Sequence, residues 1–430
     1  MAKEHYFISD MHMGGDGNLM ECDYAEEFAG WLQELEQKAT PESELIIMGD
    51  TFGLWESTEV KHVAAAKAII ATHQPIFDQL RCVGEKMQIT MMVGNHDYDM
   101  ACDPGYVALL KEYNITLDTS LTLWREVGSR RLCIEHGQQA DTYNAAPDWG
   151  NRYALPVGFF ITETAVSGAS KYSVHGATDW LKDIRSVGTM QIPDWIFSNY
   201  FYREMRRPLR WLLIPFLLLI GLAVLVLIAQ VLKRLGIFDV NIVLNNWLID
   251  SLGVAGNLLQ LILVIDAVAL IALTIAGIPL YLVMRDVRRV LERFQLMGAS
   301  GQDGFDPDSN APYLERARQV FEERPDAAVY LFGHTHAAFL QEENGRVILN
   351  TGSWLKLLHR VSVRFGMLPP VYYPTFRLSV FRIYGEGDQI IIEYREAAKA
   401  PEQELSGLQR TFLLGKQPAA PNPIPARTVI

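Results

Sequence analysis

The first third of the chain contains short continuous apolar runs separated by longer stretches of mixed polarity. The runs Tyr6–Ile8, Leu45–Met48, Ile89–Val93 and Leu132–Ile134 are each followed within two residues by Gly, Asp or His. Continuous apolar runs of this length are typical of strands that are buried on both faces. The pattern therefore predicts the strands of an α/β core.

Two stretches between these runs have the composition of helices that pack on a sheet. The segment from Asp23 to Lys38 places its apolar residues among acidic and amide residues at helical spacing: Tyr24, Phe28, Trp31, Leu32 and Leu35. A second helix is predicted over Val60–Leu80. Both are expected to cover one face of the sheet.

The middle of the chain contains two long apolar segments. Trp211–Ala229 has no charged residue, and Leu258–Met284 is interrupted only by Gln260 and Asp266 among its polar side chains. Segments of this length predict a transmembrane hairpin. A hydrophobic platform in one leaflet and a buried dimerisation arm are the alternatives. Asp266 then marks a helix–helix contact, a homodimer contact or a functional polar site.

Basic residues flank the predicted hairpin on both sides. Four arginines precede it: Arg203, Arg206, Arg207 and Arg210. Four arginines follow it: Arg285, Arg288, Arg289 and Arg293. The connecting loop has only two basic residues, Lys233 and Arg234. By the positive-inside rule, the rest of the protein faces the cytoplasm from the inner (cytoplasmic) membrane. The arginines serve as topology anchors, or also as a collar for an anionic lipid headgroup.

Strand-like runs return downstream at Val329–Phe332, Val347–Leu349 and Ile390–Ile392. The α/β core is thus predicted in two parts, with the hairpin inserted between them. The expected division is a first core part over 1–140, a cap or connecting region over 141–205, the hairpin over 206–290, a second core part over 291–396 and a disordered tail over 397–430. The tail is rich in Pro, Gln and Ala.

The composition limits the binding partners that are expected and indicates the redox state of the cysteines. The formal net charge of −12 argues against a surface built for nucleic acid, so no nucleic-acid partner is expected. Four cysteines without a CxxC pair, in a chain of 430 residues, indicate reduced thiols. The N-terminal sequence has no basic stretch followed by an apolar one, which predicts no cleaved signal peptide.

Five polar clusters each follow an apolar run, where α/β sheets usually place their sites. They are Asp10-x-His12, Gly49-Asp50, Gly94-Asn95-His96-Asp97, His136-Gly137 and Gly333-His334-Thr335-His336. In the first and last clusters, residues two apart are expected to point the same way along a strand. Carboxylate, imidazole and amide ligands without a thiolate suit Mn²⁺, Fe²⁺, Zn²⁺ or Ni²⁺.

The order of these clusters resembles the calcineurin-like metallophosphoesterases, whose pattern is DxH, GD, GNH(D/E), H and GHxH. The resemblance implies a β-sandwich flanked by helices and two divalent metal ions, with Mn²⁺ the first choice. Matching positions assign Asp10, His12 and His336 to the first ion and Asn95, His136 and His334 to the second, with Asp50 bridging the two. Paired ions of this kind share a water or hydroxide that attacks phosphorus in line.

The third cluster also supplies the expected catalytic pair. In the resemblance, His96 contacts the phosphate and protonates the leaving group, and Asp97 orients its imidazole. The implied activity is metal-dependent hydrolysis of a phosphate ester or pyrophosphate bond.

A closer partial likeness is to the UDP-diacylglucosamine pyrophosphohydrolases. It rests on Gly49–Trp55, His136–Asp141 and Asn350–Trp354, although that family typically has GNRD where this chain has Gly94-Asn95-His96-Asp97. The soluble members of that family also have no spanning hairpin. Together with the predicted hairpin, the likeness favours a membrane-anchored enzyme with a lipid-linked substrate. The alternatives are a hydrolase of a soluble nucleotide or phosphodiester, and a non-catalytic membrane scaffold on the same fold.

Overall fold

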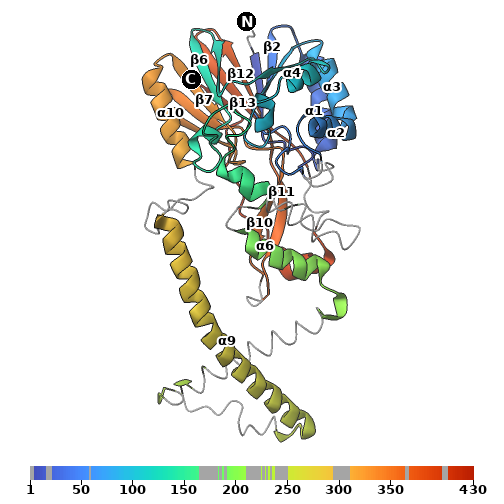
Figure 1. Cartoon of the computed structure of the whole chain (residues 1–430), viewed down its shortest axis with the longest axis vertical. Coiled ribbons are helices and arrows are strands. Elements are labelled where there is room, and N and C mark those ends of the chain that lie inside the picture. Colours follow the sequence, from blue (N-terminus) through green and yellow to red (C-terminus); the bar gives the residue numbers. More distant parts are fainter. Residues whose placement is uncertain are drawn as a thin grey trace.

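Two β-sheets face each other in the upper part of the molecule as drawn in Figure 1. The computed structural model describes residues 4–15, 22–57, 60–163, 191–209, 250–293, 310–363, 368–399 and 405–430, and a few isolated residues between 183 and 237. The larger sheet has the order β14 (Arg427–Val429), β13 (Gln389–Ala397), β12 (Leu378–Glu386), β1 (Glu4–Ile8), β2 (Ser43–Ile47), β3 (Gln88–Met92), β4 (Ile115–Asp118). The smaller sheet has the order β5 (Thr122–Val127), β6 (Arg130–Glu135), β7 (Ala327–Phe332), β9 (Arg346–Asn350), β8 (Phe339–Glu343).

Helices cover the outer faces of both sheets, giving an α/β/β/α sandwich. The larger sheet carries α1 (Ala25–Lys38), α2 (Val63–Thr72), α3 (Gln74–Gly84) and α4 (Gly105–Lys111), and the smaller one carries α10 (Ala311–Glu323). Between the sheets, side chains such as Phe7, Ile46, Ile134, Leu331 and Phe381 form a fully buried core. The predicted strands and the α/β class are thereby confirmed.

The predicted helix over Val60–Leu80 is two helices instead of one. It breaks at His73, and α3 begins with Pro75 in its first turn, where the ring fixes a helical φ and needs no amide donor. The first predicted helix agrees with α1 to within two residues at its start.

The strands that precede the polar clusters run parallel within each sheet. β1, β2 and β3 are parallel neighbours in the larger sheet, and β6 and β7 are parallel neighbours in the smaller one. Parallel strands bring their carboxyl ends to one edge of a sheet. The packing of the two sheets then places these edges together.

The tail predicted to be disordered carries regular structure. α11 (Gly407–Leu413) begins with a capping box formed by Ser406 and Gln409, and β14 pairs antiparallel with β13 at the sheet edge. Ile424 and Ile430 also pack against the core between the sheets. The Pro-rich composition misled the prediction because strand pairing and apolar contacts order this segment from outside.

A small lobe lies beside the sandwich (Figure 1). It contains the hairpin of β10 (Lys356–Val361) and β11 (Val371–Phe376), together with α6 (Ile192–Asn199) and the π-helix η5 (Tyr200–Glu204). Phe201, Tyr202 and Leu413 are buried against β10 and β11. The segment from β10 to α11 therefore joins the lobe to the core.

The inserted transmembrane hairpin must be corrected. Most of the first apolar segment, 211–229, lies outside the described residues, and the second lies within α9 (Val254–Arg293), which extends away from the sandwich (Figure 1). Over the described part of the chain, no helix combines the length and apolar character needed to cross a membrane.

Candidate metal centre

All seven predicted ligands meet at the edge where the parallel strands end. Asp10 and His12 follow β1, Asp50 follows β2, Asn95 follows β3, His136 follows β6, and His334 and His336 follow β7. Five of them are buried at 2% exposure or less: Asp10, His12, Asp50, Asn95 and His136. The site therefore draws on both sheets and on both parts of the chain.

The direction of these side chains is set by a left-handed backbone conformation and not by the alternation of side chains along a strand. Asp10, His12, Asp50, His334 and His336 have φ between 45° and 67°, which makes them five of the nine non-glycine residues with positive φ in the described part of the chain. This conformation is uncommon for residues with a Cβ, and such residues cluster at functional sites. Each ligand thus lies in a tight turn just past its strand and points across the sheet edge.

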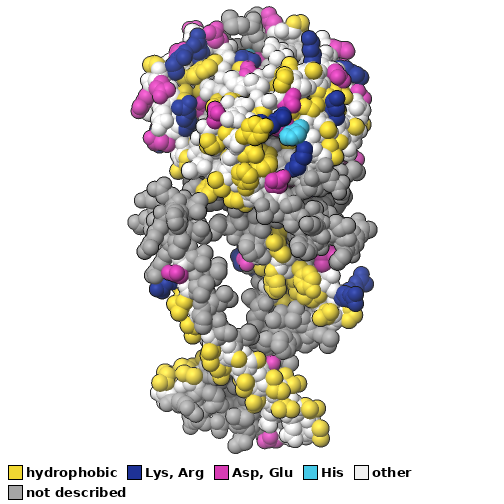
Figure 2. Space-filling view, in the orientation of Figure 1, with side chains coloured by type: hydrophobic (Ala, Val, Ile, Leu, Met, Phe, Trp, Pro, Cys, Tyr) yellow, Lys and Arg dark blue, Asp and Glu magenta, His cyan; other side chains and the backbone are white. Residues whose placement is uncertain are grey.

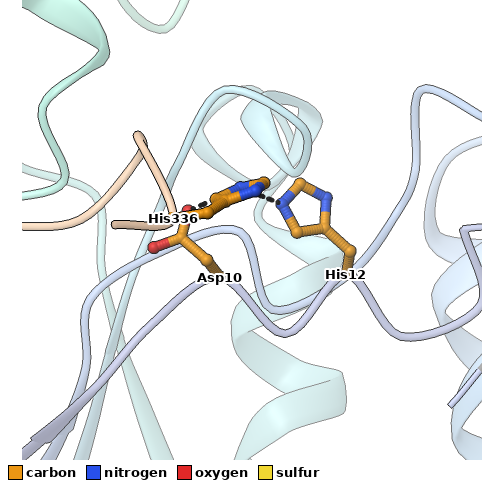
Figure 3. A group of neighbouring side chains, drawn as sticks. All are labelled: Asp10, His12 and His336. Atoms are coloured by element: carbon orange, nitrogen blue, oxygen red, sulfur yellow. Dashed lines mark hydrogen bonds and ion pairs between the residues drawn. The ribbon is translucent and has the colours of Figure 1, made fainter. Parts of the chain in front are cut away.

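The first group consists of Asp10, His12 and His336, whose ligand atoms lie within 4.8 Å of one another. The His336 imidazole lies between the Asp10 carboxylate and the His12 ring, with Nε2 at 3.4 Å from Asp10 Oδ1 and 3.3 Å from His12 Nε2 (Figure 3). Ligands bound at about 2.0–2.2 Å to a common ion lie about 3.0–3.6 Å apart. The spacing fits a divalent ion.

The second group consists of Asp50, Asn95, His136 and His334. His136 Nε2 lies 3.2 Å from Asn95 Oδ1 and 3.3 Å from Asp50 Oδ2, and the rings of His136 and His334 are in edge contact. Asp50 Oδ2 also lies 3.4 Å from His12 Nε2 in the first group. One carboxylate oxygen therefore faces both groups, while Asp50 Oδ1 accepts a hydrogen bond from the His96 backbone N–H at 2.8 Å.

The electrostatics of this centre favour a cation. Burial acts to raise the pKa of Asp50, but the imidazoles of His136, His12 and His96 hold it well below its ordinary value. Burial acts to lower the pKa of His136, yet the Asp50 carboxylate raises it to about 10. Buried carboxylates and ring nitrogens that face one another in this way need positive charge between them. The donor set thus fits two divalent ions.

Three glycines of the motifs lie so close to the ligand side chains that a larger residue would not fit. A Cβ on Gly94 would lie 2.2 Å from Asp50 Oδ1, one on Gly333 would lie 2.5 Å from Asp10 Oδ2, and one on Gly49 would lie 2.8 Å from His136 Nδ1. Of these three, only Gly49 has a positive φ, at 93°. Glycine here makes room for the neighbouring ligand as much as it permits a turn.

His96 lies at the rim of the centre, next to a carboxylate that the sequence did not indicate. Its ring contacts His12 edge-on, and its Nδ1 is 2.8 Å from Oε1 of Glu56, a residue with no exposed surface. Trp55 covers the ring with centroids 4.6 Å apart. The imidazole is therefore held by Glu56 and Trp55, both from the loop after β2.

Asp97 was expected to orient His96, and the structure places it elsewhere. Its carboxylate accepts hydrogen bonds from the backbone N–H groups of Gly94 at 2.5 Å and Thr51 at 2.8 Å. Burial and the nearby Asp50 charge raise the pKa of Asp97 to about 7. Through these two hydrogen bonds, Asp97 ties the loop after β3 to the loop after β2.

Two imidazoles of the second group are fixed from behind. His136 Nδ1 lies 2.8 Å from the Met48 carbonyl oxygen, and His334 Nε2 lies 3.0 Å from Asp141 Oδ2. Such outer partners set the tautomer and orientation of a metal-binding imidazole. Glu56 and Asp141 are the residues that sequence reasoning missed; both lie beside quoted motifs, after Trp55 and at the end of the His136–Asp141 stretch, but no local pattern identifies their partners.

The comparisons with known proteins agree with this arrangement. Residues 6–196 match the calcineurin-like phosphoesterase family, which is the family that the motif order predicted. No curated protein sequence matches the chain. The match indicates a metal-dependent phosphoester hydrolase, and the two ligand groups above are candidate metal sites.

Among solved structures, the similarities are remote. A predicted phosphoesterase from Streptococcus pneumoniae TIGR4 is 10% identical with a TM-score of 0.28, over 94% of this chain and 96% of that one. A dimetal phosphatase from Danio rerio is 9% identical with a TM-score of 0.35, over 92% of this chain and 96% of that one. Values this low carry no argument about substrate.

Proposed function

We propose that this protein hydrolyses a phosphate ester or pyrophosphate bond of a lipid-linked substrate, using two Mn²⁺ ions, at the cytoplasmic face of a membrane. The observation that best supports a hydrolase is that one oxygen, Asp50 Oδ2, lies close to both ligand groups. It is 3.4 Å from His12 Nε2 and 3.3 Å from His136 Nε2. Two divalent ions held by these residues would supply an activated water and neutralise the charge of the phosphate.

The protein's own residues then perform two tasks. Asp10, His12, Asp50 and the other ligands fix the reacting centre on rigid turns after buried strands. His96 lies beside this centre and donates a proton to the leaving oxygen, with Glu56 holding its Nδ1 so that Nε2 is the group presented to substrate. Trp55 keeps water from one face of the ring.

An apolar surface beside His96 supports a substrate with a hydrophobic part. Trp55 contacts Phe159 in the helix of residues 157–163, and Phe159 contacts Phe160. That helix exposes Val157 at 49%, Phe160 at 55% and Ile161 at 55%. Apolar side chains at this exposure next to a reacting centre suit an acyl or prenyl chain rather than a free nucleotide.

Exposed apolar side chains along α9 support the membrane location. Leu258, Leu261, Ile265, Val268 and Ile275 are each more than half exposed. In Figure 2, hydrophobic side chains gather at the end of the molecule formed by α9. Contact with a lipid surface would remove this area from water.

The test is turnover by Mn²⁺-loaded protein on phosphomonoesters, phosphodiesters, nucleotide sugars and lipid pyrophosphates. We expect the highest kcat/KM on a lipid pyrophosphate, and we expect Phe160→Ser to lower it there while sparing a short-chain analogue. Val107→Ser, on α4 and 46% exposed, is the matched control. Preference for a soluble nucleotide would refute the lipid substrate, and absence of turnover with both ions bound would favour the scaffold.

A further inference from the structure

Asp141 approaches the metal centre from outside the ligand set. It follows the short helix η2 (Gln138–Ala140), and its Oδ2 lies 3.0 Å from Nε2 of His334, 193 residues away in the sequence. Both side chains are largely buried, at 14% and 8% exposure. This contact joins the start of the connecting region, 141–205, to the second core part at the site.

The Asp141 carboxylate is itself held in place. The Tyr143 backbone N–H donates to Oδ1 at 2.8 Å, and Asn144 Nδ2 donates to Oδ2 at 2.6 Å. The Tyr143 carbonyl in turn accepts from the Gly158 N–H at 2.9 Å, in the helix that carries the apolar surface beside His96. A carboxylate fixed by local donors presents its remaining lone pair in a defined direction.

This contact decides which nitrogen of His334 is available to an ion. Because a carboxylate only accepts hydrogen bonds, His334 must carry its proton on Nε2. Nδ1 is buried and makes no hydrogen bond within the described residues. His334 offers one ring nitrogen to the group that it forms with Asp50 and His136, and Nδ1 is the nitrogen that the Asp141 contact leaves available. Without Asp141, either tautomer and a rotated ring would be accessible.

We propose that Asp141 is a positioning residue for the second metal site, holding His334 with Nδ1 directed at the ion. The inference rests on the proposed two-metal function and assigns a role to a residue outside the ligand motifs. Loss of an outer partner of this kind typically weakens metal affinity about 10–100-fold. The effect should fall on the second site, because His334 belongs to that group.

The experiment is a Mn²⁺ titration of the full chain by calorimetry, with electron paramagnetic resonance to detect coupled Mn²⁺ pairs. Asp141→Ala should weaken the second ion about 10–100-fold and remove the coupled signal at two equivalents, while the first ion keeps its affinity. Asp141→Asn retains an acceptor oxygen and should recover part of the loss. Asp148→Ala, on the same segment with its carboxylate bonded to Asn151, is the control.

The outcomes separate this inference from the function on which it rests. Unchanged affinity for both ions in Asp141→Ala, or equal weakening of both, would overturn the positioning role. Failure of the wild-type protein to bind two Mn²⁺ ions would instead overturn the two-metal function itself. Thermal unfolding of the metal-free variants, measured alongside, shows whether any loss reflects unfolding.

Discussion

Glu56 offers a sharp test of how the rim of the centre works. The residue is fully buried, and its Oε1 lies 2.8 Å from His96 Nδ1. We expect Glu56→Gln to lower kcat with metal content unchanged, because Glu56 pairs with His96 and is not itself a proposed ligand, although its carboxylate lies within 4.8 Å of a His12 ring nitrogen. Loss of proton donation should matter most when the leaving oxygen is strongly basic.

The magnitude follows from the contact. Loss of a partner that orients an imidazole at a metal site typically costs about 10–100-fold in activity, and each 1.36 kcal/mol in a barrier changes the rate tenfold. Full loss in Glu56→Ala should therefore lower kcat roughly 10–100-fold, and Glu56→Gln, which keeps a neutral acceptor, should lose less. His96→Ala sets the upper limit at about 10²–10⁴-fold.

The assay is kcat for a series of phosphate esters with the same phosphate and increasingly basic leaving groups. The loss in both Glu56 variants should grow along the series and be small for p-nitrophenolate, which leaves without protonation. Glu126→Gln, a surface carboxylate paired with Arg131, is the control. A loss that is the same for every leaving group, or one accompanied by loss of metal, would refute the positioning of His96 by Glu56.

Three further predictions test the centre and its support. The Asn side chain in Asp50→Asn has one oxygen, which cannot serve both the ions and the His96 backbone N–H. Elemental analysis should therefore find fewer than two Mn²⁺ ions per chain, and turnover should be nearly lost. Retention of both ions would contradict the bridging role of Asp50. Gly94→Ala forces a Cβ to 2.2 Å from Asp50 Oδ1, so metal affinity should drop although no ligand is changed, and normal affinity would contradict the close approach. Burial acts to raise the pKa of Glu44, but hydrogen bonds, chiefly from Arg125, lower it from 4.5 to about 2. The ionised Glu44 carboxylate therefore stabilises the folded protein above pH 4.5, and this stabilisation is lost as pH falls toward 2. Glu44→Gln should therefore lower the free energy of unfolding by about 3 kcal/mol at pH 7 and by clearly less at pH 3 in denaturant titrations, and an equal difference at both pH values would contradict the linkage.

Local sequence was sufficient for the core strands and for the residues that meet at the centre. A buried strand needs a short continuous apolar run, and a strand-end ligand needs a polar residue directly after it, so both features lie within a few residues of one another. Asp10, Asp50, Asn95, His136 and His334 could be named on that basis. The geometry that joins them could not, because it depends on left-handed turns and on how two sheets pack.

Long-range packing decided the remaining features. Glu56 meets His96, and Asp141 meets His334, across 40 and 193 residues of sequence, so no local pattern reveals either pair. The C-terminal strand β14 forms because β13 offers an open edge, against the expectation from its composition. The apolar segments show the limit of an argument from composition. Apolar content alone predicted a membrane crossing, whereas no helix in the described part of the chain is long and apolar enough to cross a membrane. Sequence by itself therefore determined the chemistry of the ligands. Tertiary structure decided which carboxylate oxygen the two ligand groups share and which carboxylates hold the imidazoles, because these contacts form only between segments that are distant in the chain.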